Sequence, residues 1–262
     1  MKNTASYFLF NAIYFTLICL IYVAVGINTD NFVFEVVLLG TLFAVSFISA
    51  MYFYMKAMEH GPLGLSFLFF SAGILLPILF GIIVYNEPAP LHRFAGLILL
   101  FAAFSISTTG KGGGKMSKKW MKYIIIGSVN NGIIGIALKM CRSFVSEYAM
   151  VDFLFLGFGQ AAVISFIIGV VILLKVKPDV SHFGVTAFAL VVLGTAVSTA
   201  AGNYIMVFLS LHVSALVQFP VISGSLVLTS IVTSRFLFKE QVTKQHYITI
   251  GVGLISIVML SI

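Results

Sequence analysis

The sequence has few charged residues. Only 9 % of its 262 residues are Asp, Glu, Lys or Arg, whereas a soluble domain has about 25 %. No Asp or Glu falls in the middle of an apolar stretch, so the chain lacks the intramembrane carboxylate on which proton-driven exporters of cations usually rely. A glycine-rich phosphate loop followed by Lys-Ser or Lys-Thr is also absent, which argues against direct use of ATP.

Residues for metal binding and nucleophilic catalysis are scarce as well. The two cysteines, Cys19 and Cys141, form no C-x-x-C pair and both fall in apolar stretches, where packing is their expected role. The five histidines are scattered in predicted loops without the spacing of a metal site or of a nucleophile's base. We therefore expect no metal, no cofactor and no enzymatic activity.

Long apolar runs are what the sequence does contain. Sixty per cent of the residues are hydrophobic, and runs of the length that crosses about 30 Å of hydrocarbon recur along the chain. A helix satisfies its own backbone hydrogen bonds in lipid, and the alternation of a membrane barrel is missing. The sequence predicts an all-α, polytopic membrane helical bundle of about nine spans, at 6–26, 33–57, 62–85, 90–108, 119–142, 150–174, 183–209, 213–237 and 244–262.

The cations are sorted between the two ends of these spans. The chain has a net charge of +7, but its Lys and Arg residues lie in short loops and at span ends, which excludes a nucleic-acid-binding patch. Twelve of the fifteen cations fall on one side, and only Arg93, Lys139 and Arg142 fall on the other. By the positive-inside rule the N-terminus is cytoplasmic and the C-terminus outside, in a bacterial cytoplasmic membrane.

Two halves of the chain follow one plan. Tyr52 recurs as Tyr204 and His60 as His212, both at an offset of 152, while Glu87 recurs as Glu240. This predicts a first repeat at 1–110, a basic Gly-rich linker at 111–118 and a second repeat at 119–262. The fifth span has no partner in the first half, so either the protein uses nine spans or a first helix has been skipped before Met1. Repeats of five spans would be inverted relative to each other.

The repeated segments resemble a known family. The pattern A-x3-G-P-L from Ala57, followed by an apolar span with Pro77 and then E-P-x3-H-x3-G-L-I from Glu87, is similar to the EamA-type domain of the drug/metabolite transporter superfamily. A weaker copy lies around Phe219-Pro220 and Lys239-Glu240. The resemblance implies two inverted five-span repeats, usually ten spans with both ends cytoplasmic, that transport small metabolites, amino acids or drugs. The nine spans and the charge-derived orientation depart from that family pattern.

Candidate residues for a solute cavity lie in interrupted or polar spans. Corresponding spans that are broken by proline or glycine are the best sequence indication of a transport site, and polar side chains deep in a span are costly unless they are paired or face a wet cavity. Ordinary small-residue packing is the alternative for each of them. The candidates are Asn11, Tyr52, Pro77, Asn131, Lys139, Gln160, Asn203, Tyr204, Gln218, Pro220 and Ser223.

Two kinds of charged residue have alternative readings. Lys139 is a candidate contact for an anionic solute, or it extends outward past Arg142 to water. Glu87 and Glu240 follow spans three and eight, and they are either ion-coupling carboxylates or interfacial anchors that bond loop amides and reach water.

The function expected from these features is a secondary permease for a small uncharged or zwitterionic solute, working by alternating access. Its partners would be the lipid bilayer and that solute, and the sequence leaves the oligomeric state open, a homodimer included. Two alternatives are a non-transporting or truncated membrane partner protein and an integral membrane enzyme that acts on lipid-linked substrates.

Overall fold

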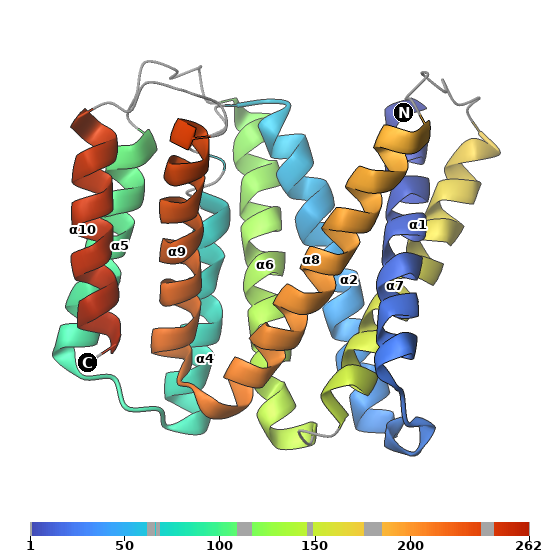
Figure 1. The fold of residues 1–262 in the computed structure, drawn as a ribbon, viewed down its shortest axis with the longest axis horizontal. Helices are drawn as coiled ribbons and strands as arrows, with labels where there is room; N and C mark the ends of the chain where they lie inside the picture. Colours follow the sequence, from blue (N-terminus) through green and yellow to red (C-terminus); the bar gives the residue numbers. More distant parts are fainter. Residues whose placement is uncertain are drawn as a thin grey trace. The chain divides into compact units, whose positions relative to one another are not determined.

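The computed structural model describes residues 2–61, 66, 69–108, 117–145, 149–175, 185–236 and 244–261. Within these ranges the chain is helical and has no strand, which confirms the expected all-α class (Figure 1). Two short 3-10 turns, η1 (Thr29–Asn31) and η2 (Ala72–Ile74), accompany the α-helices. The α-helices are α1 (Lys2–Val25), α2 (Phe34–Met58), α4 (Leu75–Tyr85), α5 (Leu91–Thr108), α6 (Lys118–Phe144), α7 (Met150–Leu173), α8 (Val185–His212), α9 (Ala215–Phe236) and α10 (Lys244–Ser261).

Five helical segments are long and apolar enough to cross a membrane. They lie at Thr4–Val25, Phe34–Met58, Lys118–Phe144, Met150–Leu173 and Val191–His212. Four shorter apolar helices coincide with the other predicted spans, at Phe69–Tyr85, Leu91–Ala103, Ala215–Ser225 and Gly251–Leu260. The chain is thus a helical protein of membrane-spanning character. Nine crossings and the inversion of the repeats remain predictions.

The helices form two compact units that differ from the predicted halves. Unit 1 consists of Met1–Ile48 and Met140–Leu211, and unit 2 of Ser49–Lys139 and His212–Ile262. Each unit therefore combines helices from both predicted repeats. Residues 111–116 of the predicted linker, and Glu240 of the second repeat, lie outside the described residues.

Aromatic side chains fill the core of unit 1. The Phe158 ring of α7 contacts the rings of Phe15 from α1 and of Phe43 and Phe47 from α2, with centroids 5.3 to 5.8 Å apart. Tilted and edge-to-face arrangements such as these are the favoured geometry of aromatic pairs. The cluster fixes α1, α2 and α7 against one another.

Small residues set the packing of α6 against α4 in unit 2. A Cβ added to Gly132 would lie 2.6 Å from the carbonyl oxygen of Gly73, and one added to Gly135 would lie 2.6 Å from Pro77 Cγ. Glycine permits this close approach because it has no side chain. Gly73 and Pro77 of the third predicted span therefore lie in close contact with α6.

Helices at corresponding positions of the predicted repeats pack in pairs. Within unit 1, α1 contacts α7, and within unit 2, α4 contacts α9 and α5 contacts α10. The sequence matches the first span to the sixth, the third to the eighth and the fourth to the ninth, which are these same three pairs.

Candidate functional site

A buried ion pair lies at one end of unit 2. The ammonium group of Lys139, near the end of α6, lies 2.7 Å from Glu87 Oε1, and the two side chains are 0 % and 3 % exposed. Lys139 Nζ also donates to the carbonyl oxygen of Val213 at 2.6 Å. Glu87 Oε2 accepts from the backbone N–H of Ala215 at 2.7 Å. The positive end of the α9 dipole and the Lys139 ammonium therefore both face this carboxylate.

This geometry corrects two expectations. The readings in which Lys139 extends past Arg142 to water, and in which Glu87 reaches water as an interfacial anchor, are wrong because both side chains are buried and paired with each other. The part of the second reading that holds is the bond to a loop amide, since Ala215 N–H opens α9 directly after the connection from α8.

The backbone at the end of α4 places Glu87. Asn86 adopts the left-handed conformation, with φ 50° and ψ 38°, and its N–H caps the carbonyl of Gly81. The N–H of Glu87 bonds the same carbonyl at 3.2 Å, so two successive amides close the end of α4 over this carbonyl. Pro88 follows and cannot continue the helix.

A glycine makes room for that carboxylate. A Cβ added to Gly81 would lie 2.5 Å from Glu87 Oε2 and 3.0 Å from Ala215 Cβ. The turn, the glycine and the start of α9 together hold Glu87 in one position.

Two interrupted helical segments contact each other in unit 2. The 3-10 turn η2 interrupts the segment Phe69–Tyr85 of span three, whose α4 part contains the buried Pro77, and Pro220 lies inside α9. A proline inside a helix removes one backbone hydrogen bond and leaves a carbonyl without its helical donor. Since α4 contacts α9, unit 2 brings both interruptions together.

The remaining candidates of unit 2 have varied surroundings. Asn131 donates its amide N–H to the carbonyl of Phe70 at 3.2 Å, so this side chain bonds the helical segment before α4. Gln218 is buried in the first turns of α9, and Ser223 is half-buried one turn further along. Tyr52 lies far along α2, where the Lys56 ammonium is 6.0 Å from the centroid of its ring.

Unit 1 holds the other four candidates. Asn11 of α1 is buried, and its amide nitrogen has no hydrogen-bond partner in the described part of the chain. Gln160 of α7 donates to the carbonyl of Val37 at 3.3 Å, while its Oε1 is buried without a partner there. Asn203 of α8 bonds the carbonyl of Thr199 in its own helix at 2.9 Å, and Tyr204 is exposed.

Sequence reasoning missed two polar residues of unit 1. Asp152, in the first turn of α7, is 1 % exposed and accepts from Asn28 N–H at 2.7 Å and from Asn31 Nδ2 at 2.6 Å. Ser165 is fully buried, and its hydroxyl has no partner among the described residues. The loop donors of Asp152 have no pattern in the sequence that would reveal them, and a single serine in an apolar span has no distinguishing signal.

A hollow in unit 1 is lined by neither of these polar residues. It has a volume of about 540 Å³ and is lined mostly by aliphatic side chains of α2, together with Glu35, Met140 and Phe144. None of the predicted site residues lines it. Because its walls are almost wholly apolar, it offers a solute no groups that would fix its orientation.

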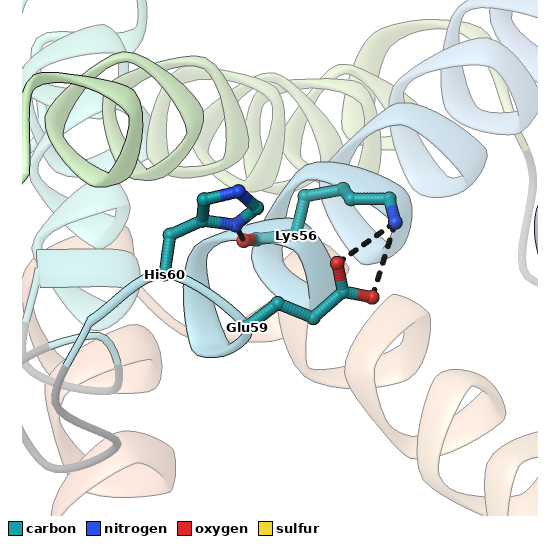
Figure 2. A network of polar contacts seen from close by, with 3 residues as sticks. All are labelled: Lys56, Glu59 and His60. Carbon is teal, nitrogen blue, oxygen red and sulfur yellow. Dashed lines mark hydrogen bonds and ion pairs between the residues drawn. The ribbon is translucent and has the colours of Figure 1, made fainter. Parts of the chain in front are cut away.

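A polar network closes the end of α2 (Figure 2). The ammonium of Lys56 lies 2.8 and 3.1 Å from the two oxygens of Glu59, and His60 Nδ1 lies 2.8 Å from the carbonyl of Lys56. At 20 % and 45 % exposure the ion pair is in contact with solvent. Its contribution to stability is therefore small, and its local bonds make it a helix end rather than a site.

Comparison with known proteins yields a likeness of fold only. No protein-family model matches the sequence, and a search of curated proteins finds no match. Several solved structures do match. One, described only as a crystal structure of a protein, has a TM-score of 0.77 at 15 % sequence identity, over 97 % of this chain and 88 % of that chain. The chain therefore shares its fold with a known structure, and that likeness carries no substrate.

Proposed function

We propose that the chain is a secondary permease of a small uncharged or zwitterionic solute, built from two inverted repeats like those of the EamA-type drug/metabolite transporters. The proposal includes nine membrane crossings, a cytoplasmic N-terminus and an outward C-terminus. The apolar helices and the cation distribution support this placement.

The contact between α4 and α9 is the observation that carries the proposal. These helices come from corresponding positions of the two predicted repeats, and each contains a proline, Pro77 in the first turn of α4 just after the 3-10 turn η2 and Pro220 inside α9. Paired broken helices at a repeat interface are where secondary transporters bind their solutes. Freed backbone carbonyls and the neighbouring Gln218 and Ser223 would supply hydrogen bonds to the solute.

The buried ion pair favours a solute without net charge. Lys139 is the candidate that would have attracted an anion, but Glu87 already neutralises it. An added anionic group would meet the Glu87 carboxylate, and an added cation would meet the Lys139 ammonium. A neutral or zwitterionic solute avoids both conflicts.

Uptake into liposomes tests the proposal. Purified protein would be reconstituted and supplied with radiolabelled neutral amino acids, polyols and aromatic amides, each followed by chromatography to detect chemical change. We expect saturable uptake of at least one unmodified solute, and lower uptake by the Pro77→Ala/Pro220→Ala variant at equal reconstitution. A solute that emerges chemically altered would support the enzyme alternative. Absence of uptake across the panel would support the non-transporting alternative.

A further inference from the structure

Three buried polar atoms of unit 1 lack a partner among the described residues. They are the amide nitrogen of Asn11 in α1, the amide oxygen of Gln160 in α7 and the hydroxyl of Ser165 in α7. Asn11 is 6 % exposed and Ser165 0 %. Unpaired polar atoms are costly in a protein core and more so at membrane depth, where no bulk water reaches them.

Among these three residues, Ser165 is the clearest case of a missing hydrogen bond. A helical serine or threonine usually bonds a carbonyl of its own preceding turn, as Thr16 does to Ala12 and Ser198 to Gly194. Ser165 makes no such bond among the described residues. Its hydroxyl therefore remains available to a group outside its own helix.

The packing of α1 against α7 brings Asn11 and Ser165 to one level. Leu9 packs against Gly169 and Cys19 against Gly159, so the two helices run antiparallel. Two residues onward from Leu9 is Asn11, and four residues back from Gly169 is Ser165. With about 1.5 Å of rise per residue, the two side chains differ by about 3 Å in height along the seam. Gln160 lies about 7.5 Å further along α7.

Both side chains belong to the faces that meet in the core of unit 1. Asn11 is four residues before Phe15 and eleven before Tyr22, which places the three on one face of α1. Ser165 is seven residues after Phe158 and shares its face of α7. The rings of Phe15 and Tyr22 contact the ring of Phe158, so these faces meet between the helices.

We propose that this seam binds an uncharged solute that has an aromatic or apolar body and a carboxamide or hydroxyl group. The Asn11 amide donates to the carbonyl or hydroxyl oxygen of the solute, and the Ser165 hydroxyl accepts from its N–H or O–H. The neighbouring phenylalanines cover its apolar part. Along the described parts of these two helices and their ends, the charged residues nearest in sequence are Lys2, nine residues before Asn11, and Lys175, ten residues after Ser165.

This seam is a second site, distinct from the proposed solute site between α4 and α9, and it rests on the proposed permease function for its role in transport. Binding itself can be measured without transport. The probe is benzamide, with benzoate and benzylammonium as charged molecules of similar size.

Binding and stability are measured together on four variants of the full-length protein in detergent. Asn11→Leu and Ser165→Ala should each raise by about 3- to 10-fold the benzamide concentration needed for half of the maximal thermal stabilisation, the effect of one lost hydrogen bond. The matched controls are Asn130→Leu and Ser198→Ala. Their side chains bond carbonyls of their own helices, and their response to benzamide should equal that of the unmodified protein.

The melting temperature of the protein without benzamide gives a second, independent test, because the inference predicts the direction of its change in each variant. Asn11→Leu and Ser165→Ala should raise its melting temperature by about 2–4 °C, because each removes an unpaired buried polar group. Asn130→Leu should lower it, because it removes a made bond. A purely structural role for Asn11 and Ser165 predicts a lower melting temperature in all three.

Four results would overturn the inference. They are an unchanged benzamide response in both seam variants, a lowered melting temperature in both, equal binding of benzoate or benzylammonium, and no benzamide binding to the unmodified protein while the seam variants are stabilised. The last result would mean that the seam holds only water.

The experiments distinguish a failure of the seam site from a failure of the permease proposal. Solute uptake that is unaffected in Asn11→Leu would refute this site and leave the permease intact. Seam-dependent benzamide binding without uptake of any solute would refute the permease and leave the site intact.

Discussion

In unit 2 the buried carboxylate of Glu87 lies against an ammonium group, whereas in unit 1 the buried carboxylate of Asp152 is held by two neutral N–H donors. Both carboxylates lie at the start of a helix, α9 for Glu87 and α7 for Asp152, where the helix dipole favours negative charge. The two carboxylates differ in what the loss of one partner does to them. Loss of Lys139 leaves a charge unpaired, whereas loss of one loop donor leaves Asp152 with another.

The two units also differ in how the polar side chains in their interiors are hydrogen-bonded. In unit 2 the polar groups of α6 bond carbonyls of the preceding chain, as Asn131 and Ser128 do to Phe70. In unit 1 the amide nitrogen of Asn11 and the hydroxyl of Ser165 have no such partner among the described residues. These side chains of α6 are thus bonded to the chain before α4, whereas two buried polar atoms of α1 and α7 have no partner among the described residues.

Removal of one member of the ion pair should have the largest effect. Lys139→Met should destabilise the protein by about 3–5 kcal/mol, because Glu87 is left as an unpaired buried charge. The free energy of unfolding in denaturing detergent measures this. The double variant Glu87→Gln/Lys139→Met should recover most of the loss, since an uncharged pair has no desolvation cost of this kind. A double variant as unstable as the single one would show that the pair matters for packing and not for charge.

Asp152→Asn should have a smaller effect, about 1.5–3 kcal/mol, the range for hydrogen bonds to a charged group. Only the amide oxygen can accept, so one of the two donors, Asn28 N–H or Asn31 Nδ2, loses its bond. The same unfolding measurement applies, with the exposed Asp30→Asn as the control expected to be neutral. A loss equal to that of Lys139→Met would remove the distinction between the two carboxylates.

Substitution of one glycine by alanine in each unit should change the stability of the protein in opposite directions. Gly132→Ala should destabilise unit 2 by about 1–3 kcal/mol, because the new Cβ meets the carbonyl of Gly73. At Gly202 of α8 a Cβ meets nothing within 4 Å, so Gly202→Ala should stabilise by up to about 1 kcal/mol through helix propensity. Thermal melts of the two variants side by side give the signs, and a destabilised Gly202→Ala would mean that another helix occupies that face.

The smallest effect is expected at the end of α2. Lys56→Ala removes a partly exposed ion pair with Glu59 and a contact with the ring of Tyr52, and it should cost less than about 1 kcal/mol. The effect should shrink further when the melting temperature is measured at 1 M salt. A loss of stability above that value that does not depend on salt would mean that the network of Lys56, Glu59 and His60 in Figure 2 does more than close a helix end.

Hydropathy and periodicity located the helices because both are local properties of the sequence. The described helices coincide with the predicted spans. The ion pair was missed for a physical reason. Glu87 and Lys139 each lie near a span end, where a charged side chain normally reaches water, and their pairing depends on how α4 meets α6.

The polar residues of the spans show the same limit. Sequence identified Asn11, Gln160 and Asn131 as buried polar groups but could not separate a satisfied amide from an unsatisfied one. Asn131 is satisfied by the carbonyl of Phe70, and the Asn11 nitrogen is left open. That difference depends on carbonyls supplied by other helices, and single-residue properties do not encode it.

The interleaving of the two units has a consequence for biosynthesis. Unit 1 needs residues up to Leu211 and unit 2 needs the segment from His212 to Ile262, so neither can be complete when the first half of the chain leaves the ribosome. The carboxylate of Glu87 is made 128 residues before the amide of Ala215 that it accepts from. During translation the helices of the first half therefore precede the second-half helices that complete each unit.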